Sequence, residues 1–163
     1  MKKLLGLAAL VLVSFIMQST VLQFLQIFGV TVNLVLVVLV VVSLQTDEIT
    51  GAGLGFMVGF LTDILYAHFF GVNTLLFFSI GYLTGRISED VYKFDYFTNL
   101  YFVLFGTLFY HLFFYFIHYF LKIGSEAILI TFMPILVEIG LNLIILYPIF
   151  RLEKSIFRKL KIN

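Results

Sequence analysis

Six apolar runs follow one another along the chain, separated by short polar stretches. A helix needs about 20 apolar residues to cross the hydrocarbon core of a bilayer, so five or six spans use up a chain of 163 residues. Only 12% of the residues are Asp, Glu, Lys or Arg, about half of the charged fraction of an average soluble domain. These features predict an all-α, polytopic membrane protein without a soluble domain.

The runs predict six transmembrane helices in a compact bundle, at about 4–25, 33–44, 49–66, 72–86, 98–121 and 127–150. The second and third runs are short, so five spans with one re-entrant or merged segment stay open. The first run resembles a secretory signal, but it lacks a small-x-small cleavage site and is long enough to span, so we interpret it as a retained helix. We divide the chain into a transmembrane domain, 1–150, and a basic cytoplasmic tail, 151–163.

Lysine and arginine predict the orientation of the chain. When six spans are drawn with both termini on one side, nine of the 10 basic residues fall on that side. Cytoplasmic loops carry such an excess of positive charge, so we expect both termini in the cytoplasm and an even number of spans.

The tail carries apolar residues at spacing i, i+4 and i+8 between its basic residues, which is typical of an amphipathic helix on an anionic membrane surface. Its basic residues either anchor the topology or bind the membrane surface or a cytoplasmic partner. They are Arg151, Lys154, Arg158, Lys159 and Lys161.

Gly51, Gly55 and Gly59 recur every four residues in the third run, and Asp63 continues the series. Small residues at this spacing form a groove in which a neighbouring helix backbone can approach closely, so we expect the third helix at the centre of the bundle. A carboxylate inside a bilayer is costly unless it pairs with donors or stays protonated. Asp63 is therefore either a lock between helices or a contact for a ligand or partner.

Three further polar residues are candidates for the same interior. Glu138 and Asn142 lie four residues apart in the last run, so they share one helix face. Asn33 stands at the outer start of the second run. These residues either line a cavity together with Asp63 or bond between helices.

Known intramembrane catalytic sets are not visible in the sequence. Asp63 lacks the second glycine of the Gly-x-Gly-Asp motif of aspartyl proteases, and no serine has a rhomboid-like setting. His111 and His118 lie about 10 Å apart along a helix, too far to share one metal ion. Cysteine is absent and no basic face with interleaved aromatics is present, so we expect no enzyme activity, no cofactor, no metal and no nucleic acid.

Two stretches together resemble the rod shape-determining protein MreD family: VNLVLVVLVVVSL, residues 32–44, and GAGLGFMVGFLTDILYAHFFGVNTLLFFSIGYLTGR, residues 51–86. Members pair a short apolar second helix with a glycine-rich third helix that carries an aspartate, followed by a Gly-Tyr-hydrophobic-x-Gly helix. The matching positions are Gly55, Gly59, Asp63, Ile64, Leu65, Gly71, Gly81, Tyr82 and Gly85. Many members begin the second helix with a proline, where this chain has Val32.

The resemblance implies a non-enzymatic scaffold in the inner membrane of a bacterium. Such a protein binds the bitopic protein MreC directly, and with it links MreB filaments to the glycan polymerase RodA and its transpeptidase. A homo-oligomer within this complex stays open. As a hypothesis, Asp63 and the glycine groove engage the helix of MreC or its extracellular base.

The MreD family is similar in fold to the substrate-binding S components of energy-coupling factor vitamin transporters. An S component is therefore the alternative function. Against it, the first run lacks the Ala-x-x-x-Ala docking face that S components commonly use, and the outer loops are poor in charge. A lipid or small-molecule flippase would need a polar route across the bundle.

Overall fold

The computed structural model describes residues 2–66, 69–88, 91, 95–120 and 128–159, and these residues form six α-helices and one short 3-10 helix without any strand. The helices are α1 (Lys2–Thr20), α2 (Leu34–Leu44), α3 (Glu48–Tyr66), α4 (Val72–Ile87), α5 (Tyr96–Phe120) and α6 (Ile128–Lys159), and the 3-10 helix is η1 (Leu22–Phe24). Each apolar run of the sequence thus forms a helix, and the all-α prediction is confirmed.

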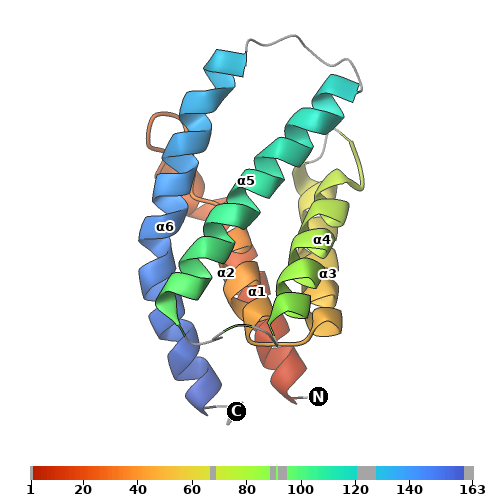
Figure 1. Ribbon diagram of the computed structural model, residues 1–163, viewed down its shortest axis with the longest axis vertical. Coiled ribbons are helices and arrows are strands. Elements are labelled where there is room, and N and C mark those ends of the chain that lie inside the picture. Colours follow the sequence, from red (N-terminus) through yellow and green to blue (C-terminus); the bar gives the residue numbers. More distant parts are fainter. Residues whose placement is uncertain (1, 67–68, 89–90, 92–94, 121–127, 160–163) are drawn as a thin grey trace.

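Among the residues that the structure describes, four helical segments are long and apolar enough to cross a membrane: 4–24, 48–66, 96–117 and 133–156. Successive helices alternate in direction, so that α1 begins and α6 ends at the same end of the bundle (Figure 1). We call this end the basic end, because Arg86, Arg151 and Lys154 lie there. The six-span topology stays a prediction, which the shared end of α1 and α6 supports.

The helix at the centre of the bundle is α2 rather than α3. All 11 residues of α2 are buried, and α2 packs against α1, α3, α4, α5 and α6. A helix that is apolar on every side has no preferred outer face and is stable in the interior of a bundle. At 1.5 Å per residue α2 is about 16 Å long, roughly half of the hydrocarbon thickness of a bilayer. It is therefore too short to cross the bilayer by itself, and its first residue lies inside the bundle.

A tight hairpin connects the outer end of α1 to the start of α2. The backbone amides of Ile27 and Val30 each donate to the other residue's carbonyl, at 2.9 and 3.0 Å. The two residues between them, Phe28 and Gly29, have φ angles of 53° and 77°. Both φ angles lie in the left-handed region, which glycine adopts readily and other residues rarely adopt. The side chain of Phe28 is 91% exposed at this turn.

Helices α3 and α4 pack with their backbones in direct contact. A Cβ atom added to Gly51 would overlap the carbonyl oxygen of Gly81, and one added to Gly55 would overlap that of Phe77. At Gly59 the nearest atom, the carbonyl oxygen of Asn73, would lie at 2.6 Å. The glycine groove of the sequence is therefore an interface within the chain, filled by α4.

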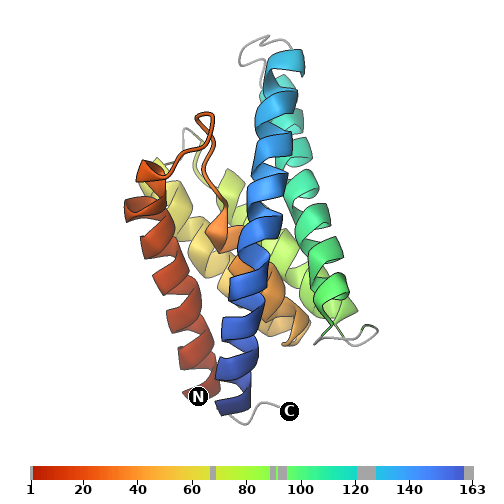
Figure 2. The same ribbon diagram turned by 90° about the vertical axis from the view of Figure 1, so that its left-hand side faces the viewer.

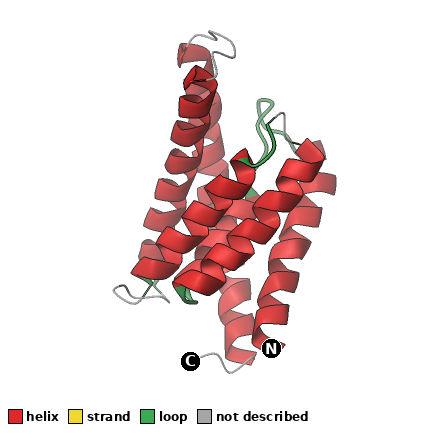
Figure 3. Ribbon diagram, turned by 90° about the vertical axis from the view of Figure 1, so that its right-hand side faces the viewer, coloured by secondary structure: helices red, strands yellow, loops and turns green. Residues whose placement is uncertain are grey.

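The two longest helices, α5 and α6, form a hairpin that extends past the other helices at the end opposite the basic end (Figures 2 and 3). Helix α6 has 32 residues and continues through Pro134 and Pro148. It also continues through residue 150, where the sequence analysis placed a domain boundary. Residues 151–159 thus prolong α6 in line rather than forming a separate helix.

Candidate functional site

Asp63 caps the N-terminus of α4 from the last turns of α3, and its side chain is 3% exposed. Its Oδ2 accepts hydrogen bonds from the amides of Gly71 and Thr74, at 3.0 and 2.8 Å, and from the Thr74 hydroxyl. Its Oδ1 accepts from the amide and the side-chain Nδ2 of Asn73, at 3.1 and 3.0 Å.

Five donors therefore converge on the one carboxylate of Asp63. The first amides of a helix have no partner in their own helix, and the dipole of α4 favours a negative charge at this point. This interaction explains why an acid stands near the C-terminus of α3, where the dipole of its own helix opposes it. Asp63 has the geometry of a lock between α3 and α4.

One face of α5 extends this polar cluster towards α6. Three of its residues, Thr107, Tyr110 and His111, are spaced so that they share a face. The Tyr110 hydroxyl donates to Oδ1 of Asn73 at 3.1 Å and so joins α5 to the Asp63 cluster. His111 Nε2 lies 2.9 Å from Oε2 of Glu138 on α6.

The start of α2 is the second polar centre. Asn142 accepts from the Asn33 amide through Oδ1 at 2.8 Å and donates to the Thr107 hydroxyl through Nδ2 at 3.0 Å. Gln18 accepts from the Val35 amide at 2.8 Å, and the Asn33 side chain accepts from the Leu36 amide at 3.2 Å. Each free amide inside a bilayer costs several kcal/mol, so these three amide oxygens allow a helix to begin there.

The predicted polar residues therefore lie in three places: at the Asp63 cap, at the contact of Asn33 with Asn142, and at the pair of Glu138 with His111. Asn33 and Asn142 contact each other, whereas Glu138 pairs with His111 instead, and neither Glu138 nor Asn142 hydrogen-bonds to Asp63 in the described part of the chain. Sequence reasoning missed the partners of these residues, which are Gln18, Asn73, Thr74, Thr107 and Tyr110. The one available signal was Gly71-Val72-Asn73-Thr74, a glycine followed by short polar residues at a helix start.

The basic residues of the tail lie on the outside of α6 where the structure describes them. The Arg151 guanidinium lies 5.2 Å from the ring centre of Tyr147, and the Lys154 ammonium lies 5.7 Å from that of Phe150. Arg158 and Lys159 belong to the last turn of α6, and Lys161 lies outside the described residues.

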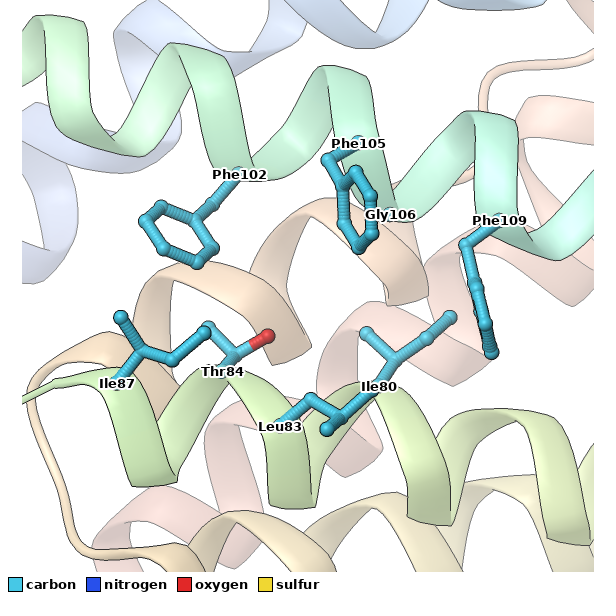
Figure 4. A pocket seen from close by; sticks show the side chains of 8 residues that line it. All are labelled: Ile80, Leu83, Thr84, Ile87, Phe102, Phe105, Gly106 and Phe109. Carbon is cyan, nitrogen blue, oxygen red and sulfur yellow. The ribbon is translucent and has the colours of Figure 1, made fainter.

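A small apolar pocket lies between α4 and α5 (Figure 4). Its volume is about 30 Å³, far below the 300–1,000 Å³ of typical ligand sites. Its lining residues are Ile80, Leu83, Thr84, Ile87, Phe102, Phe105, Gly106 and Phe109. Within the described residues, no three His, Asp or Glu side chains come together as a metal site would require.

The family of the rod shape-determining protein MreD matches residues 2–156, which include both polar centres and the glycine interface. The chain belongs to the MreD family. Membership implies a role in rod shape determination, a place in the shape-determining complex and contact with the lipid bilayer. MreD proteins are structural components rather than a known enzyme family. No curated protein and no solved structure matched the chain in the other comparisons.

Proposed function

We propose that this MreD-family protein is a non-enzymatic scaffold of the rod complex in the bacterial inner membrane, with both termini in the cytoplasm. It binds MreC directly and helps couple MreB filaments to RodA, its transpeptidase and peptidoglycan synthesis. The observation that carries the proposal is the family match over residues 2–156.

The use of the polar residues supports a scaffold. Asp63, Asn33 and Asn142 make their hydrogen bonds within the chain, to helix starts and to neighbouring helices. A binding protein for a small polar substrate would instead turn such groups into a cavity. The pocket between α4 and α5 is apolar and has room for little more than a water molecule.

The glycine interface contributes to this function by holding α3 and α4 together. Because α4 fills the groove, a helix of MreC could enter it only by displacing α4. We therefore propose that Gly51, Gly55, Gly59 and Asp63 keep the α3–α4 pair in one arrangement and that MreC binds the outer faces of the bundle.

The test is purification of the tagged protein from membranes of its own host in a mild detergent, with mass spectrometry of the proteins that accompany it. We expect MreC, with or without RodA and its transpeptidase. Recovery of an energy-coupling membrane subunit with paired ATPases would contradict the scaffold and favour a transporter S component.

A further inference from the structure

The hairpin between α1 and α2 turns large apolar side chains away from the bundle. Phe28 at its tip is 91% exposed, and Phe24 just before it is 88% exposed. Leu25 and Ile27, which lie between these two residues in the sequence, are exposed as well. An apolar surface of this kind marks a contact with lipid or with another protein.

The backbone conformation of the tip makes a phenylalanine there more unusual. Phe28 and Gly29 both have positive φ angles, as in the two-residue hairpin turns for which Asn-Gly and Gly-Gly are the favoured pairs. Phe28 therefore has an unfavourable turn conformation, and burial within its own chain does not offset it. Its apolar surface is covered by something outside the chain.

The exposed face of α1 continues into this hairpin without a polar interruption. Its exposed residues at helical spacing are Val13, Met17, Val21 and Phe24. The stretch 4–46 contains no Asp, Glu, Lys, Arg or His, so no charged group directs the loop into water. Because α1 is long and apolar enough to span a membrane, its exposed face contacts lipid, and the hairpin prolongs the same surface.

The length of α2 limits how far the hairpin tip can lie from the basic end. Helix α2 is about 16 Å long, and the polar turn 45–48 follows it at the basic end. From Asn33 back to Gly29 the chain reaches at most about 14 Å, at about 3.5 Å per residue. Helix and segment together reach about 30 Å, the thickness of the hydrocarbon core, so the tip cannot rise clear of the bilayer. The tip also ends short of the α5–α6 hairpin (Figures 2 and 3).

The backbone of the hairpin suits this depth. Irregular backbone is tolerated inside the hydrocarbon where it is buried in protein. Val32 and Asn33 are buried, and Ile27 and Val30 bond to each other through their amides and carbonyls. Only the tip then needs the polar headgroup layer, which lies at its level.

We propose that the hairpin 24–30 is inserted into the leaflet opposite the basic end, with Phe24 and Phe28 among the acyl chains just below the headgroups. Phospholipid is what covers these side chains, and the hairpin holds the start of the short helix α2 at a fixed depth. The inference uses the bilayer contact of the family and does not depend on MreC, so its test needs no partner protein.

The test is tryptophan fluorescence, because the chain contains no tryptophan of its own. The variants are Phe28→Trp and Phe24→Trp in the full chain, in vesicles of phosphatidylcholine. The lipid carries bromine near either the headgroup end or the methyl end of its acyl chains, and in separate samples iodide is present on both sides of the membrane. The controls are Phe105→Trp, at a site exposed along α5, and Ile49→Trp, at a 78% exposed site in the first turn of α3.

We expect Phe28→Trp to emit at shorter wavelength than Ile49→Trp and to lose more emission to bromine near the headgroups than to bromine near the chain ends. Phe105→Trp should show the opposite preference for bromine depth, and Ile49→Trp should lose emission to iodide. Phe24→Trp should behave as Phe28→Trp does, and it decides the question if the tip variant does not fold.

Two outcomes would overturn the insertion. Iodide quenching of Phe28→Trp as strong as that of Ile49→Trp would place the hairpin in water. Protection of Phe28→Trp from both bromine and iodide would mean that a second copy of the chain covers the tip instead of lipid.

Discussion

Replacement of Asp63 by alanine tests the lock between α3 and α4. The change removes the acceptor for three backbone amides, those of Gly71, Asn73 and Thr74, and for two side-chain donors. A buried donor without a partner costs about 1–3 kcal/mol. Since the side-chain donors can reorient, the three amides set the scale, and we expect Asp63→Ala to destabilise the protein by about 3–5 kcal/mol.

Asp63→Asn should cost less, roughly 1–2 kcal/mol. Asparagine keeps one oxygen, which can still accept from Asn73, but its NH₂ group meets the amides of Gly71 and Thr74, donor against donor. The hydroxyl of Thr74 can rotate and accept instead. Stability should therefore decrease in the order wild type, Asp63→Asn, Asp63→Ala.

The matched control is Asp47→Ala at the exposed start of α3. Asp47 accepts from the amide and the hydroxyl of Thr50, at 3.1 and 2.7 Å, and water can replace it, so its loss should cost only about 1 kcal/mol. The assay is pulse proteolysis in mild detergent over a denaturant series. If Asp63→Ala were no more destabilising than Asp47→Ala, the reasoning about the buried cap would be refuted.

Three further predictions concern other parts of the protein. Gly55→Ala should destabilise the protein by about 1–3 kcal/mol, because the added Cβ meets the α4 backbone. The control is Gly53→Ala, whose Cβ would have nothing within 4 Å and which should be neutral or stabilising by up to about 1 kcal/mol. Equal unfolding midpoints of the two variants would contradict the interface between α3 and α4. The Thr50 hydroxyl holds the pKa of Asp47 below its ordinary 3.8. The stability that Asp47 contributes should therefore be complete at neutral pH and disappear as the pH falls below about 4. A difference in stability between wild type and Asp47→Ala that does not change with pH would contradict this. Charge reversal at both Arg158 and Lys159 should reduce the amount of MreB that co-purifies with the protein. An unchanged amount of MreB would mean that these residues only fix the topology of the chain in the membrane.

The helices could be predicted from the sequence because the apolar runs are separated by polar or glycine-containing stretches. The predicted second run at 33–44 and third run at 49–66 agree closely with α2 and α3. The central position of α2 was missed, although a run of 11 residues without a polar face already points to a helix surrounded by others. Periodic glycines show that a helix has a close neighbour, and they do not show which helix that is.

The partners of the polar residues could not be predicted from the sequence. Asp63 bonds to residues only 8–11 positions further on, and this pairing was within reach of a capping argument. The contact between Asn33 and Asn142 joins residues 109 positions apart, which depends on how helices from both ends of the chain meet. The burial of Glu153, which is 1% exposed, is of the same kind, since the tail pattern alone places this acid on a surface helix.

The most direct test of the scaffold is the composition of the rod complex when this protein is depleted from its host. Tagged MreC would be purified before and after depletion, and RodA and its transpeptidase quantified in each sample. The scaffold account predicts that MreC loses both proteins after depletion while their total amounts in the membrane stay the same. Undiminished recovery of RodA and the transpeptidase with MreC would contradict it.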